Sequence, residues 1–172
     1  MVACGSYFFT VVALGRQPIL CRPDVRAALR DAIQSVQSQH PFTVDAWVLM
    51  PDHLHTIWTL SPADSDYAKR WSMIKRRVTQ QCGALDAATP TNSQSKRREG
   101  GIWQRRFWEH QIQDEADFER HADYIHYNPV KHGLVNEVRE WPYSTYHQFV
   151  KSGVYPPDWG NEAPVFKGGF GE

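Results

Sequence analysis

The chain has few cysteines and no long apolar run. Of its 172 residues, three are cysteine (Cys4, Cys21 and Cys82), and none of them forms a C-x-x-C pair. An odd number of thiols without paired spacing argues against a disulfide framework and favours a reducing compartment. No apolar stretch is long enough to span a bilayer, and the first residues lack the pattern of a signal peptide. We therefore expect a cytoplasmic protein without a membrane span.

Net charge is also absent, since 19 basic residues balance 19 acidic ones. Such a balance usually counts against nucleic acid as a partner. The charges are segregated, however, because residues 66–110 contain ten Lys or Arg and only four Asp or Glu, while both flanks are net acidic. This basic zone could hold a phosphate backbone locally, although a solvated helix face followed by a basic loop would have the same composition.

The length suits a single domain with a real core. Residue patterns predict strands at 7–13, 42–50, 53–60 and 102–113, and helices at 23–39, 66–81 and 114–128. Pro129 is expected to end the last helix. This order favours an α+β fold, an antiparallel sheet with helices packed on one face, related to the ferredoxin-like plan. We expect one domain over residues 1–160, with a mobile basic loop at 83–100, and a tail over 161–172.

His53 and His55 are the first residues that suggest chemistry. Side chains two residues apart in a strand point to the same face, so both imidazoles can converge on one metal ion while Leu54 enters the core. An H-x-H pair is weak evidence alone, because imidazole is also an ordinary polar side chain on the wet face of a strand.

Tyr124 and Asn128, in the last predicted helix, lie one turn apart on the same side. They belong to a polar stripe with Asp117 and His121, which we expect to border the sheet without being buried in it. Both residues also have a plain interpretation, Tyr124 as a half-buried aromatic and Asn128 as a residue favoured before a proline.

Together, the two motifs suit the cleavage of a phosphodiester. A metal ion held by His53, His55 and the amide oxygen of Asn128 would neutralise a phosphate oxygen while Tyr124 attacks the phosphorus. The phenol needs help to ionise near neutral pH, because its ordinary pKa is about 10.

Positive charge interleaved with aromatic rings is typical of grooves that bind single strands. Arg105 and Arg106 point to opposite faces if they lie in a strand, so we expect one of the two to touch nucleic acid. For Trp103 a place in the core is at least as plausible. The candidate DNA contacts are Lys75, Arg76, Arg77, Trp103, Arg105, Arg106, Lys131 and His132.

Three segments, MPDHLH, WQRRFWEH and DYIHYNPVKHGL, together resemble the REP-associated tyrosine transposases. These are relatives of the single-tyrosine transposases of the IS200/IS605 group in the HUH endonuclease superfamily, and the similarity covers about residues 7–160. The resemblance implies an HUH nuclease sandwich in which His53 and His55 bind Mg or Mn, Asn128 is the third ligand and Tyr124 is the nucleophile. More distant relatives use Gln where this chain has Asn128.

The resemblance also implies the substrate and the reaction. The substrate would be single-stranded DNA in repeated extragenic palindromes that fold into hairpins. The enzyme would nick and rejoin it through a 5′-phosphotyrosine intermediate, as a transposase that acts as a monomer or homodimer. Two other functions stay open at this point: a catalytically inactive DNA regulator that binds palindromes, and a zinc hydrolase of small molecules. The hydrolase lacks an obvious acidic third ligand and leaves the basic zone unexplained.

Overall fold

A computed structural model describes residues 5–83, 101–164, 166 and 169–171. Apart from residue 83, the predicted basic loop lies outside these described residues. Among the described residues, no helix is long and apolar enough to cross a membrane. The elements in chain order are β1 (Ser6–Val12), η1 (Leu14–Arg16), α1 (Pro23–Gln39), β2 (Phe42–Leu49), β3 (His53–Leu60), α2 (Tyr67–Cys82), β4 (Trp108–Gln111), α4 (Glu115–Lys131), η2 (Val138–Glu140) and α5 (Tyr146–Lys151).

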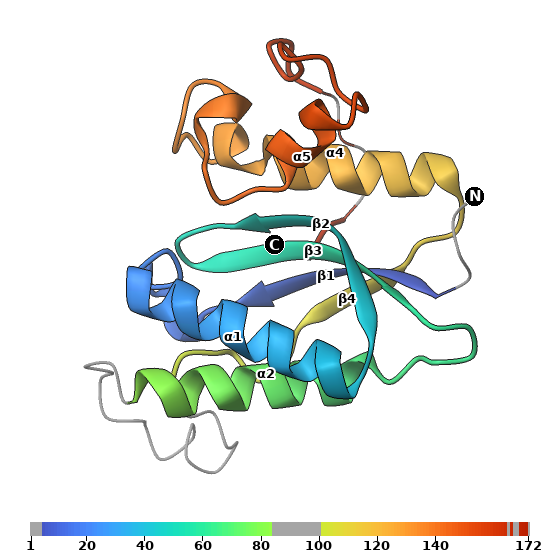
Figure 1. The fold of residues 1–172 in the computed structure, drawn as a ribbon. Helices are drawn as coiled ribbons and strands as arrows, with labels where there is room; N and C mark the ends of the chain where they lie inside the picture. Colours follow the sequence, from blue (N-terminus) through green and yellow to red (C-terminus); the bar gives the residue numbers. More distant parts are fainter. Residues whose placement is uncertain (1–4, 84–100, 165, 167–168, 172) are drawn as a thin grey trace.

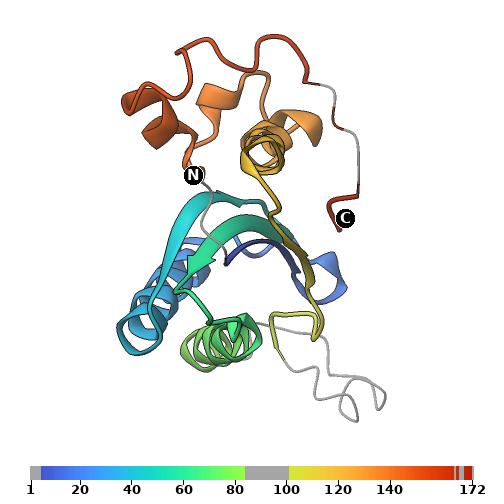
Figure 2. The ribbon, with the colours of Figure 1, turned by 90° about the vertical axis from the view of Figure 1, so that its right-hand side faces the viewer.

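The four strands form one antiparallel sheet in the order β2-β3-β1-β4. Helices α1 and α2 pack on one face of the sheet, and α4 crosses the other (Figures 1 and 2). The succession of strands and helices up to β4 is that of a ferredoxin-like unit. The predicted α+β class and antiparallel sheet are confirmed, but the helices occupy both faces and not one.

Helices cover both faces because the central strands are apolar on both. In β1, Phe8 packs in the core beneath α4, whereas Phe9 packs in the core beneath α1 and α2. In β3, Ile57 and Trp58 divide in the same way. A sheet whose central strands are apolar on both sides needs a cover on each side. The third helix therefore belongs to the core.

Two predicted boundaries were wrong. The predicted strand 102–113 pairs as a ladder only over β4, with one isolated bridge between Trp103 and Ala13. Between them the carbonyls of Gln104 and Arg105 accept hydrogen bonds from the Lys75 ammonium of α2. Those carbonyls are therefore held toward a helix.

The last helix also runs three residues further than predicted, through Pro129 to Lys131. A proline in the final turn removes only one hydrogen bond. The backbone N–H groups of His132 and Leu134 still donate to Asn128 and Pro129, at 3.0 and 2.9 Å. Asn128 and Pro129 are buried, so packing against the sheet favours this continuation.

A buried polar network joins α4 to the edge strand β2. Tyr155 donates its hydroxyl proton to Asp123 at 2.6 Å, so its oxygen accepts from Nδ1 of His126 at 3.0 Å. Nε2 of His126 lies 2.9 Å from the Thr145 hydroxyl, which accepts the Trp47 N–H at 2.8 Å. Burial lowers the pKa of His126 to about 3. The network therefore needs a neutral imidazole.

We expect acid to destabilise the fold through His126. Its folded pKa of about 3 lies below the ordinary value of about 6.5, so the unfolded chain binds more protons between these two values. The stability contributed by the neutral ring is complete above about pH 6.5 and is lost as the pH falls toward 3. Between pH 7 and pH 4.5 the loss from this group is about 2–3 kcal/mol.

Urea unfolding at both pH values measures this loss. His126→Gln should be less stable than the wild type at pH 7, but should lose less stability on acidification. Equal losses in the two proteins would contradict the assignment.

Candidate active site

His53 and His55 lie on β3 and face α4. Their rings are 4.8 Å apart between centroids and inclined by 74°, and both side chains are almost fully buried. Leu54 points to the opposite core, as strand alternation requires. The two imidazoles thus share one face of the sheet.

Helix α4 brings the other two predicted residues to these histidines. Its N-terminus is capped by the Asp114 carboxylate, which accepts the Asp117 N–H at 2.8 Å. The Asn128 amide oxygen lies 3.3 Å from Nε2 of His53. The Tyr124 ring centre lies 5.3 Å from that of His55. Residues about 70 positions apart in the sequence therefore meet in one site.

The polar stripe of α4 is more deeply buried than predicted. We expected it to border the sheet, but each of its residues is at most 4% exposed. The reason is that β4 and the C-terminal residues cover the stripe from the side. The four residues are Asp117, His121, Tyr124 and Asn128.

Asp52 orients His53, a role that the motif did not indicate. Its carboxylate lies 2.7 Å from Nδ1 of His53 and 3.2 Å from the Arg16 guanidinium. Burial raises the pKa of Asp52, but the hydrogen bond to His53 and the charges of His53 and Arg16 outweigh that effect and lower it below its usual value. An ionised carboxylate only accepts, so Nδ1 of His53 carries a hydrogen, and Nε2 of the same ring faces Asn128. The position of Asp52 directly before H-x-H was a usable signal, because ligating histidines are usually paired with a carboxylate or a carbonyl.

Thr10 does the same for His55. Its hydroxyl donates to the Phe170 carbonyl at 2.5 Å and lies 2.8 Å from Nδ1 of His55. A hydroxyl has one proton, so Thr10 accepts from Nδ1–H of His55, and this bond fixes the orientation of the ring. No sequence signal identifies Thr10, because strand register alone places it opposite His55.

Two further predicted residues lie beside the tyrosine and the histidines. The Lys131 ammonium donates to the Tyr124 hydroxyl at 2.9 Å and lies 4.7 Å from the centre of its ring. The His132 ring is 5.3 Å from that of His53. Both Lys131 and His132 are exposed, so they stand where the buried site meets solvent.

The C-terminal residues cover the tyrosine. Phe170 stacks on Tyr124 with 3.7 Å between ring centroids and 7° between planes, and Phe166 meets the same ring edge-on at 5.3 Å. The end of the chain lies beside α4 on the β4 side of the sheet (Figure 2). The sequence left the position of this tail open, and the structure places it over the site.

A second group of metal-ligating side chains, His110, Asp117 and His121, lies close by, with ligand atoms within 4.8 Å of one another. The Asp117 carboxylate already accepts from the Gln113 N–H at 2.9 Å and pairs with Arg120. The two imidazoles are stacked at 14°, so their in-plane lone pairs do not converge on one ion. Burial lowers the pKa of His121. The group therefore acts as a polar link between β4 and α4.

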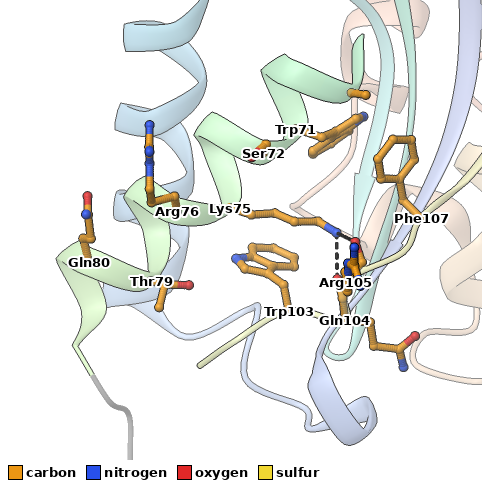
Figure 3. A pocket seen from close by; sticks show the side chains of 11 residues that line it. Trp71, Ser72, Lys75, Arg76, Thr79, Gln80, Trp103, Gln104, Arg105 and Phe107 are labelled. Carbon is orange, nitrogen blue, oxygen red and sulfur yellow. Dashed lines mark hydrogen bonds between the residues drawn. The ribbon is translucent and has the colours of Figure 1, made fainter. Parts of the chain in front are cut away.

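The remaining predicted DNA contacts lie away from the tyrosine and stay predictions. Lys75, Arg76, Trp103 and Arg105 line one pocket between α2 and residues 103–107 (Figure 3). Arg77 is half-buried on α2 and Arg106 is exposed, and neither lines that pocket.

Comparison with known proteins adds independent information. A family model described as "Transposase IS200 like" matches residues 3–128. The REP-associated tyrosine transposase of Escherichia coli K12 is 41% identical over 165 residues, which are 96% of this chain and 90% of that protein. A putative REP-associated tyrosine transposase of Haemophilus influenzae is 42% identical over 156 residues, 91% of this chain and 88% of that protein. The solved structure of a REP-associated tyrosine transposase bound to a REP hairpin is similar to this chain, with a TM-score of 0.81 and 40% identity, over 99% of this chain and 93% of that one.

We expect Phe170→Ala to expose the Tyr124 ring. Tyr124 is 2% exposed, and Phe170 covers one whole face of its ring. Tetranitromethane nitrates accessible phenols, so peptide mapping by mass spectrometry should find Tyr124 nitrated several-fold faster in the variant than in the wild type. Tyr146, equally buried in another cluster, serves as the internal control and should not change. Equal rates of Tyr124 nitration in both proteins would contradict the conclusion that Phe170 shields this ring.

Proposed function

This chain belongs to the IS200-like transposase family, and within it to the REP-associated tyrosine transposases, and on that premise we propose that it nicks and rejoins single-stranded DNA at hairpin-forming repeated palindromes. The observation that carries the proposal is the buried meeting of the Tyr124 phenol with His53 and His55. The solved structure of a 40% identical REP-associated tyrosine transposase contains a bound REP hairpin, which supports the same substrate for this chain.

In the proposed nicking step, the Tyr124 oxygen attacks the phosphorus of the scissile phosphodiester. A bond forms between that oxygen and phosphorus, and the bond from phosphorus to the 3′ oxygen breaks. The phenol loses its proton and the leaving oxygen gains one, so the products are a 5′-phosphotyrosine and a 3′-OH. Attack by another 3′-OH reverses the step, rejoins DNA and restores the phenol. The ester keeps the bond energy, so rejoining needs no nucleotide cofactor.

We assign a divalent cation, Mg or Mn, to His53, His55 and Asn128. The fit rests on position: Nε2 of His53 lies 3.3 Å from the Asn128 oxygen, and the His53 and His55 rings are 4.8 Å apart between centroids. Imidazole nitrogens and an amide oxygen gathered this closely suit a shared positive ion. When bound, such an ion neutralises phosphate oxygens and aligns the phosphorus. Asp52 and Thr10 contribute by fixing the orientation of both rings.

Lys131 is proposed to assist the nucleophile. Its ammonium already donates to the Tyr124 hydroxyl, so it can balance the negative charge that this oxygen carries during attack and again when it leaves. Because it is exposed at the mouth of the site together with His132, it can also face the phosphate backbone. This arrangement supports both residues as DNA contacts.

A single copy of the chain is proposed to be sufficient for nicking. All the residues assigned to the step come from one chain, since Tyr124 and His55 lie 5.3 Å apart between ring centres and the Asn128 oxygen lies 3.3 Å from His53, without a partner subunit.

Tyr124→Phe should abolish covalent attachment to DNA, because the variant lacks only the attacking oxygen. The measurement uses a labelled hairpin oligonucleotide with a single-stranded flank, incubated with the protein and Mg or Mn. The wild type should give a slow band on a denaturing gel, and Tyr127→Phe, the matched control, should keep it. A band that persists in Tyr124→Phe but disappears in Tyr127→Phe would move the nucleophile to Tyr127. Tight binding by the wild type with no adduct would favour the inactive DNA regulator.

Asp52→Asn should weaken the metal site without removing a ligand. The amide loses the charge that holds Nδ1–H of His53, and changes of this kind typically cost about 10–100-fold in metal affinity. Titration with Mn²⁺ followed by electron paramagnetic resonance measures the affinity directly. Asp31→Asn, an exposed carboxylate on α1, should leave it unchanged. Equal affinities for all three proteins would contradict the role of Asp52.

A further inference from the structure

A pocket of about 380 Å³ opens between α2 and residues 103–107. It is lined by residues of α2, which covers one face of the sheet together with α1, whereas Tyr124 belongs to α4 on the opposite face (Figures 1 and 2). The proposed cleavage chemistry uses none of the residues that line it. Its volume is at the lower end of the range for ligand pockets, which run from roughly 300 to 1,000 Å³, so it suits one small planar group.

Aromatic rings form much of the wall of this pocket. Trp71 and Trp103 are nearly fully buried, and Phe107 is half-buried beside them. The indole N–H groups of Trp71 and Trp103 have no hydrogen-bond partner among the described residues, but both nitrogens are themselves buried. What these side chains offer a ligand in the pocket is therefore aromatic surface for stacking.

Lys75 holds the two sides of the pocket together. Its ammonium donates to the carbonyls of Gln104 and Arg105, at 2.7 and 3.3 Å, and lies 5.4 Å from the centre of the Phe107 ring. Burial lowers the pKa of Lys75 to about 8. Because its protons are directed to backbone carbonyls, Lys75 serves as a wall of the pocket and fixes its width.

Two guanidinium groups stand at the rim. Arg76 and Arg105 are exposed, and they flank Lys75 and Trp103 from opposite sides (Figure 3). Within the described part of the chain, neither guanidinium has a hydrogen bond or an ion pair. A guanidinium presents a fork of donors that matches phosphate oxygens. An apolar slot between two such groups is complementary to a base with a phosphate on each side of it.

The edge of the sheet connects this pocket with the tyrosine. β4 is an edge strand, and the side chains at its start alternate between the two faces of the sheet. Phe107 packs in the core on the pocket side, whereas Trp108 packs on the Tyr124 side, 5.7 Å from Phe8. Single-stranded DNA that crosses this edge of the sheet can therefore contact both the pocket and the site around Tyr124.

We propose that the pocket holds one unpaired base of the single-stranded DNA that flanks the hairpin, stacked among Trp103 and Phe107, with the neighbouring phosphates on Arg76 and Arg105. The inference rests on the proposed function, because the bound strand is the one whose phosphodiester reaches Tyr124. The pocket adds a site that holds the strand and is separate from the site that cuts it.

The first test is the salt dependence of binding to a hairpin oligonucleotide with a single-stranded flank. Each phosphate contact to a single strand contributes about 0.7 to the slope of log affinity against log salt. The double variant Arg76→Ala, Arg105→Ala should therefore bind more weakly and lower the slope by about 1.4. Arg30→Ala, an exposed arginine on α1, is the matched control and should keep the wild-type affinity and slope. An unchanged slope in the double variant would overturn the inference.

The second test locates the base. Abasic sites are placed one at a time along the flank, and 5-iodouracil is placed at the same positions for photocrosslinking to the wild-type protein. We expect one position whose abasic form binds about tenfold more weakly, in line with the usual stacking contribution of a base. Iodouracil at that position should crosslink to Trp103 or Phe107 by peptide mapping. A flank with no sensitive position, or crosslinks that all fall outside the pocket, would overturn the inference.

The two proposals fail in different ways. Covalent attachment to Tyr124 is scored on the same oligonucleotides. If the double variant forms the adduct and has the wild-type salt slope, the proposed base-binding role of the pocket is wrong and the proposed nicking activity stands. If a crosslink to the pocket and a reduced slope are found without any adduct, the role of the pocket stands and the proposed nicking activity is wrong.

Discussion

The packing of α4 across the sheet is the interaction on which the rest of the structure depends. Because β1 and β3 place Phe8 and Ile57 on the face that α1 and α2 leave open, a third helix must cover that face as well. This cover brings the Asn128 oxygen to 3.3 Å from His53 and sets the Tyr124 ring against His55. The same contact that completes the core therefore assembles the site, and the His126 network fixes the helix against β2.

The active site is organised by neighbours that hold protons in place. Asp52 and Thr10 each hold Nδ1 of one histidine and so fix the orientation of both rings. Thr10 also gives its only proton to the Phe170 carbonyl, and Phe170 stacks on Tyr124. The orientation of His55 and the cover of Tyr124 are thus coupled through one hydroxyl. Displacing the tail would change both together.

The basic zone has two different uses. Arg70 is buried and bonds the Asp64 carboxylate together with the backbone carbonyls of His40 and Pro41, so it stabilises the start of α2. Lys75 joins α2 to residues 103–107 in a comparable way. Arg76 and Arg105, by contrast, are exposed at the rim of a pocket. Composition alone cannot separate these roles, because an arginine that serves the core and one that serves a ligand differ only in what surrounds them.

Local patterns were enough to determine the types of the four strands and three long helices, the ends of α1 and β3, and the grouping of His53 with His55, because strand and helix periods act over a few residues. The spacing of Tyr124 and Asn128 indicated a shared side of a helix for the same reason. Tertiary structure alone decided that this side is buried, that α4 continues through Pro129, and that residues 104–105 leave the ladder for Lys75. It also decided that Thr10 meets His55 and that Phe170 covers Tyr124, 46 residues away. Such contacts depend on strand register and on which faces of the sheet need a cover, and neither is recorded in any short stretch of sequence.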